Sequence, residues 1–170
     1  MAGLPAVVAF AAAIALADRP APGAPPPDIP SPCRAALDAR LPGWKLSPPP
    51  PGLREWAAAR REVTNFVTGD FDDDGARDTA VLVAATRKAA GVPRLAVCLA
   101  RDAQARLFLI DAPYGRDGIS LTRKGTRDYD HESRRTVRYR TDGVHAYTFE
   151  KSGATYLFRR GGWIRIVDSD

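Results

Sequence analysis

The residues in this sequence best suited to chemistry are five aspartates between Asp70 and Asp78, in the pattern D-x-D-x-D-G-x-x-D. Gly75 stands where a calcium loop needs a sharp turn, and carboxylates fill loop positions 1, 3, 5 and 9. Ca²⁺ prefers a cage of hard oxygens from carboxylates and backbone carbonyls. The pattern therefore predicts one Ca²⁺ site. Its expected ligands are Asp70, Asp72, Asp74, the carbonyl of Ala76, and Asp78.

This loop is not an EF-hand, because Val81 stands where that loop needs Glu or Asp, and both flanks have the alternation of strands. The alternative is a solvated, metal-free hairpin, since Asp-Gly is itself a good turn sequence. Crowded carboxylates repel one another and raise each other's pKa unless a cation lies among them, which favours the metal. If Ca²⁺ binds, Asp73 should point outward, because it lies between alternate positions that supply the ligands.

The segment Val67–Val83 resembles the calcium-loop hairpin of FG-GAP/VCBS-type repeats, which occur in integrin alpha-chain propellers and many bacterial secreted proteins. The likeness lies in Gly69-Asp70-Phe71, the Asp-rich loop and the hydrophobic strand after it. It implies calcium ligands at the same five positions. Only one copy is visible, without the family's Phe-Gly…Gly-Ala-Pro element, so no propeller is implied. The layout also resembles small exported bacterial proteins of unknown function that carry one such loop.

Other polar clusters give weaker indications of chemistry. Asp128, Asp130, His131 and Glu132 are interpreted as a solvated loop, because His-Glu here lacks the second His of a zinc-protease helix. His145 lies in an expected strand and is interpreted as structural. The leading hypothesis is therefore a non-enzymatic exported module that binds or supports something in the envelope. The alternatives are a small secreted hydrolase and a metal-free structural or inhibitor module.

The formal charge is +5, and the half from Thr79 to Asp170 carries 17 Lys/Arg against 10 Asp/Glu. This excess could attract an anionic envelope component. Nucleic acid is an unfavoured partner, because the sequence has no recognisable nucleic-acid-binding motif. Parity places three arginines on one strand face, which is the ordinary pattern of a half-exposed strand and also the best candidate anion-binding surface. They are Arg134, Arg138 and Arg140.

Two cysteines, Cys33 and Cys98, are present, and neither has the spacing of a redox or zinc motif. In an exported protein an even cysteine count favours a disulfide. The pair would connect the first helix to a central strand.

The start of the chain predicts export to the periplasm or the medium. The apolar run Leu4–Leu16 is shorter than the ~20 residues of a membrane-spanning helix. Ala15-Leu16-Ala17 supplies the small-x-small pattern that precedes cleavage, so residues 1–17 are expected to be a signal peptide. The alternative is a buried N-terminal helix. Residues 18–32 contain seven prolines and predict an extended linker. No other segment is expected to span a membrane.

Residues 33–170 are expected to form a single β-rich domain of the α+β class. We predict an antiparallel meander of about seven to nine strands, with two short N-terminal helices packed on one face. Ser31 should cap the first helix, and Leu53 and Trp56 mark the second. The segments Arg94–Leu99 and Arg106–Asp111 are apolar on both faces and should be central. The other expected strands are Val63–Thr68, Thr79–Thr86, Ile119–Leu121, Thr136–Arg140, Val144–Phe149, Thr155–Arg159 and Trp163–Val167.

Overall fold

The computed structural model describes residues 28–60, 62–84, 93–101, 104–113 and 116–167. The expected signal peptide and most of the linker lie outside the described residues. The described chain is mainly β, with two helices and ten strands rather than seven to nine. The elements are α1 (Ser31–Arg40), α2 (Pro51–Arg60), β1 (Phe66–Gly69), β2 (Asp78–Val83), β3 (Arg94–Arg101), β4 (Gln104–Ile110), β5 (Gly118–Thr122), β6 (Arg127–Asp130), β7 (Arg135–Arg138), β8 (Gly143–Thr148), β9 (Ser152–Arg159) and β10 (Gly162–Val167).

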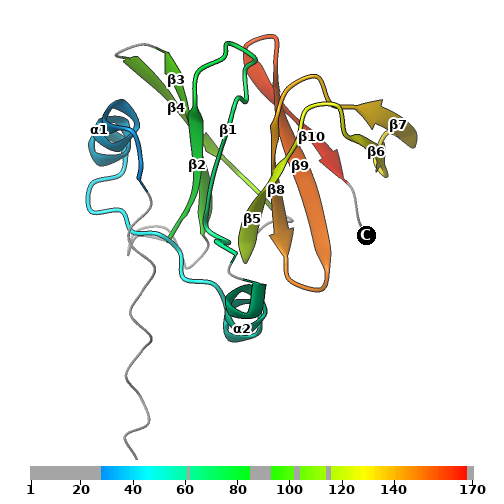
Figure 1. Cartoon of the computed structure of the whole chain (residues 1–170), viewed down its shortest axis with the longest axis horizontal. Coiled ribbons are helices and arrows are strands. Elements are labelled where there is room, and N and C mark those ends of the chain that lie inside the picture. The colour runs from blue at the N-terminus through cyan, green and yellow to red at the C-terminus, as the bar shows by residue number, and fades with distance from the viewer. Residues whose placement is uncertain (1–27, 61, 85–92, 102–103, 114–115, 168–170) are drawn as a thin grey trace, which may run out of the picture.

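The strands form two four-stranded antiparallel sheets and one separate hairpin (Figure 1). The first sheet has the order β1-β2-β3-β4, and the second has the order β10-β9-β8-β5. Strand β5 pairs with β8, while β6 and β7 pair only with each other. The prediction of one continuous meander is therefore wrong, because the chain changes sheets after β4 and inserts a hairpin between β5 and β8.

The main core lies between the two sheets and follows the period of two expected of strands. Leu82 of β2 and Val97 of β3 meet Ile119 of β5 and Val144 of β8, all fully buried. The opposite face of the first sheet packs against α1. Strand β3 is thus covered on both faces, as its sequence predicts. Strand β4 is an edge strand with intermediate burial, so the prediction of a central position for it is wrong.

Helix α1 buries Cys33 and Leu37 against the first sheet, and a disulfide joins Cys33 to Cys98 of β3 with a Cα–Cα distance of 5.7 Å. The predicted pairing is confirmed. Ile29 belongs to the same cluster, although the sequence placed it in the linker. The helix is capped by Pro30 rather than by Ser31, without a side-chain cap bond.

Helix α2 lies apart from α1, near the ends of β5 and β8 in Figure 1. Its Trp56 ring lies 6.1 Å from the ring of Phe149. The two helices therefore do not share one face of a sheet. Within the described ranges, no helix is long and apolar enough to cross a membrane.

Strand β6 is the element that the sequence did not predict. The segment expected to be a solvated loop, residues 128–132, includes most of β6 and the start of the turn after it, and Asp130 is buried at the end of that strand. Its carboxylate accepts hydrogen bonds from the backbone N–H groups of Glu132, Ser133 and Val167. These bonds replace water and allow an aspartate to be buried.

Candidate metal centre

The Asp-rich segment is the turn of the β1–β2 hairpin, with Gly69 paired to Asp78 where the loop begins and ends. Both flanks are antiparallel strands, as the sequence predicts. Gly75 has a φ of +84°, which suits glycine, and Asp73 has a φ of +63°. The left-handed residues fold the loop back on itself and bring its first and last aspartates together.

Three carboxylates converge in this loop. One oxygen from each of Asp70, Asp72 and Asp78 lies within 4.8 Å of the others. Asp78 is fully buried, whereas Asp70 and Asp72 are partly buried. Three hard, anionic oxygens at this separation can hold a metal ion.

Backbone amides hold two of these carboxylates in place. Asp70 accepts the N–H groups of Asp74 and Gly75, both at 3.1 Å, one on each carboxylate oxygen. Asp78 accepts the N–H of Phe71 at 2.7 Å and that of Ala100, on β3, at 2.9 Å. A carboxylate oxygen has more than one lone-pair site, so these bonds orient the oxygens without using all their capacity.

Asp72 differs, because its Oδ1 is buried and has no hydrogen-bond partner among the described residues. Burial raises the pKa of Asp72, and the charges of Asp74 and Asp70 raise it further. Burial also raises the pKa of Asp78 to about 6, although the N–H groups of Ala100 and Phe71 act in the opposite direction. The loop thus concentrates negative charge that its own hydrogen bonds do not fully compensate.

Asp74 lies outside the group of three. Its Oδ2 is 3.6 Å from Nε of Arg101, and its Oδ1 accepts the N–H of Ala76 at 2.8 Å. Asp73 is exposed and lies 2.6 Å from Nζ of Lys124. Ligation by Asp74 and by the Ala76 carbonyl stays a prediction from sequence.

Asp142 belongs to the surroundings of this loop, although the sequence indicated only a turn at Asp142-Gly143. Its Oδ2 accepts the N–H of Asp70 at 3.3 Å, and its Oδ1 accepts the N–H of Lys124 at 2.9 Å. A Cβ on Gly69 would lie 3.0 Å from Oδ2 of Asp142, so glycine permits this close approach. A residue just before β8, in the second sheet, thereby supports the Asp-rich loop of the first sheet.

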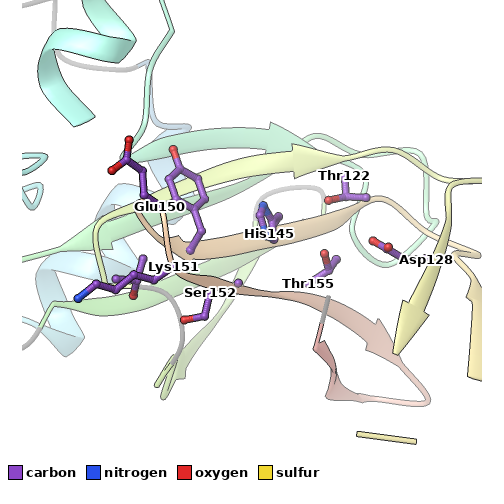
Figure 2. A pocket seen from close by; sticks show the side chains of 10 residues that line it. Thr122, Asp128, His145, Glu150, Lys151, Ser152 and Thr155 are labelled. Atoms are coloured by element: carbon purple, nitrogen blue, oxygen red, sulfur yellow. The ribbon is translucent and has the colours of Figure 1, made fainter. Parts of the chain in front are cut away.

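A separate pocket of about 540 Å³ lies on the outer face of the second sheet, around His145 (Figure 2). His145 Nδ1 lies 3.3 Å from the Ser120 hydroxyl, and its ring stacks on Tyr147 at 5.4 Å. Glu150 and Asp128 lie on opposite sides of His145 in Figure 2. Ser120 is not among the residues that line this pocket, and the two carboxylates that do line it, Asp128 and Glu150, do not face each other as a carboxylate pair would.

The three arginines grouped by parity separate in the structure. Arg138 ends β7 and Arg140 follows it, both exposed, while Tyr139 between them is buried. Arg134 lies in the turn before β7 with a φ of +54°, so the strand alternation does not extend to it. Of these three arginines, Arg138 and Arg140 line a groove beside the Asp-rich loop, and Arg134 does not.

Comparison with known proteins found no matching protein family, no matching curated protein and no matching solved structure.

Proposed function

We propose that the β1–β2 loop binds one Ca²⁺ ion and that the chain is an exported, non-enzymatic binding or structural module of the cell envelope. The observation that carries the metal proposal is the buried Asp72 Oδ1, which lacks a hydrogen-bond partner in a group of three convergent carboxylates. Such an oxygen is costly to bury unless a cation lies beside it.

The choice of calcium rests on ligand type and on sequence. All three convergent groups are carboxylates, whose hard oxygens bind Ca²⁺ or Mg²⁺ in preference to softer metal ions. The loop also follows the FG-GAP/VCBS pattern, and Asp74 and the Ala76 carbonyl could complete a larger oxygen cage. Ca²⁺ accepts six to eight ligands in flexible geometry, whereas Mg²⁺ requires a tighter octahedron.

Export rests on the apolar start of the sequence and is supported by the disulfide between Cys33 and Cys98. Disulfides persist in oxidising compartments and are rare in the cytosol. Sequencing the N-terminus of the protein expressed in a Gram-negative host tests this part. We expect the mature chain to begin near Asp18, and a cytosolic chain that retains Met1 would contradict export.

Calcium binding is tested by calorimetry and thermal melting of the mature, metal-free protein. We expect a dissociation constant of about 10⁻⁴–10⁻³ M, as at other extracellular sites. At tenfold excess over that constant, binding would add roughly 1.4 kcal/mol of stability. The melting temperature should therefore rise with Ca²⁺ and fall again with EDTA, while Mg²⁺ should have a smaller effect.

Two neighbouring aspartates provide the variant and its control. Asp72→Ala should abolish the calcium response, because it removes a carboxylate that points into the group of three. Asp73→Ala should keep most of the response, because Asp73 is exposed and bonded to Lys124. If millimolar Ca²⁺ leaves the wild-type melting curve unchanged, the loop is a turn only.

A further inference from the structure

A groove of about 670 Å³ runs beside the Asp-rich loop, between the tips of β3 and β4 and the β9–β10 turn. A second hollow of about 800 Å³ adjoins it and shares Arg138, Arg140 and Arg159 with it. Six arginines line the groove: Arg101, Arg106, Arg138, Arg140, Arg159 and Arg160.

Most of this positive charge has no acidic partner. Within the described part of the chain, Arg138, Arg140, Arg159 and Arg160 form no salt bridge, and all four are exposed. They come from two places in the fold, the end of the β6–β7 hairpin and the β9–β10 turn. An array of cations set on separate elements attracts a ligand that carries several anionic groups along its length.

The floor and rim of the groove restrict the kind of polyanion. Val137 and Ile164, both only partly buried, contribute apolar surface that can contact the CH faces of sugar rings. Phe158 is the one aromatic residue among the described residues lining the groove, and its ring packs on Phe108 and Trp163. Binding of single-stranded nucleic acid relies on aromatic rings that are free to stack on bases. These features favour an anionic carbohydrate.

The acidic rim connects the groove to the metal loop. Asp72, Asp73 and Asp74 line the same groove as the arginines. Without a cation their negative charge opposes an anionic ligand, and with a bound divalent cation this opposition is reduced. Asp74 also lies beside Arg101, so a metal that draws Asp74 away would leave this arginine available to the ligand.

We propose that this arginine-lined groove binds a linear anionic polysaccharide and that Ca²⁺ in the adjoining loop strengthens the binding. The coupling, but not the groove itself, rests on the proposed calcium function. Because coupling between two sites is reciprocal, the carbohydrate should also raise the affinity for Ca²⁺ by the same factor.

The test measures binding of hexagalacturonate to the mature protein by calorimetry. One titration is made in EDTA and the other in about 2 mM Ca²⁺, a concentration above the expected dissociation constant for Ca²⁺. A 5′-phosphorylated dT hexamer of similar charge is the comparison ligand. We expect hexagalacturonate to bind more tightly than the dT hexamer, and Ca²⁺ to strengthen its binding at least about fivefold. Binding should weaken with added salt. Equal or tighter binding of the dT hexamer would overturn the assignment to carbohydrate.

The groove is tested by the double variant Arg138→Gln/Arg159→Gln. The control is Arg34→Gln/Arg134→Gln, which removes the same charge from exposed positions outside the groove. We expect the groove variant to bind hexagalacturonate roughly fivefold more weakly in EDTA and the control to match the wild type. If both variants lose the same affinity for hexagalacturonate, net charge alone binds the polymer, and the proposed binding site in the groove is wrong.

The coupling is tested separately with Asp72→Ala, which should bind hexagalacturonate equally well with and without Ca²⁺. If the wild type binds no Ca²⁺ in the absence of carbohydrate, the proposed calcium function is wrong. The arginine variants measured in EDTA still show whether hexagalacturonate binds in the groove. If the wild type binds Ca²⁺ but hexagalacturonate binding does not change, only the coupling is wrong.

Discussion

Asp70 and Asp142 bond to each other in both directions across the two sheets. The N–H of Asp70 donates to Oδ2 of Asp142 at 3.3 Å, and the N–H of Asp142 donates to the carbonyl oxygen of Asp70 at 3.2 Å. One residue begins the Asp-rich loop, and the other immediately precedes β8. The position of the first expected metal ligand therefore depends on a residue 72 positions later in the chain.

Asp142→Ala should weaken Ca²⁺ binding although Asp142 is not among the three convergent carboxylates. The change removes the acceptors for the N–H groups of Asp70 and Lys124, and should cost about 1–3 kcal/mol of unfolding free energy. Calorimetry and urea unfolding measure the two effects. If the variant loses stability but binds Ca²⁺ with unchanged affinity, Asp142 supports the fold and does not position the loop.

Asp72→Asn should have opposite effects on stability in EDTA and in Ca²⁺. In EDTA the variant should melt at or above the wild-type temperature, since it removes charge from a crowded and partly buried site, a gain on the order of 1 kcal/mol. In saturating Ca²⁺ it should melt below the wild type, because the neutral amide is a weaker ligand. Melting curves that keep the same order in both buffers would argue against Asp72 as a ligand.

The disulfide between Cys33 and Cys98 should contribute strongly to stability, because the two residues are 65 positions apart in sequence. The chain-entropy model gives a loop of this size on the order of 4 kcal/mol. We expect dithiothreitol to lower the urea midpoint of the wild type, and to leave a Cys33→Ala/Cys98→Ala variant unchanged. Two titratable thiols in the unfolded, unreduced protein would contradict the pairing.

Stability should fall in acid partly because of Asp130. Burial raises the pKa of its carboxyl, but hydrogen bonds from Ser133, Val167 and Glu132 outweigh burial and hold the pKa below its usual value. A carboxyl with a lowered folded-state pKa contributes stability above its unfolded pKa of ~3.9, and this contribution is lost as pH falls through the folded pKa.

Asp130→Asn should therefore destabilise the protein at pH 7 by about 1–3 kcal/mol, and by less at pH 3. Urea midpoints of variant and wild type at both pH values measure this difference. Asp128→Asn on the same strand is the control, since the side chain of Asp128 accepts hydrogen bonds from the Tyr139 hydroxyl and the Tyr129 N–H, whereas that of Asp130 accepts one from β10. If the difference in urea midpoint between Asp130→Asn and the wild type is the same at both pH values, the ionised carboxylate has no role in stability.

Local features of this fold could be predicted from the sequence, because they depend on residues that are close in the chain. The runs of apolar and β-branched residues in Thr79–Thr86 and Arg94–Leu99 marked β2 and β3, and Asp74-Gly75 marked the turn that brings three aspartates together. Strand β6 could not be found this way. Its sequence, Arg-Asp-Tyr-Asp, lacks an apolar face, and it is a strand because it pairs with β7 and is held to β10 through Asp130.

Which strands become neighbours was decided only by the tertiary structure. The residue pattern indicates that β4 and β5 are strands but contains no signal for their partners, so β4 at an edge and β5 beside β8 were not predictable. The same limit applies to the site. Asp70, Asp72 and Asp78 could be grouped from their spacing, whereas Arg101, which pairs with Asp74, and Asp142, which bonds to Asp70, approach through sheet packing. The ligands therefore follow from local chain geometry, while the residues that position or neutralise them depend on contacts distant in sequence.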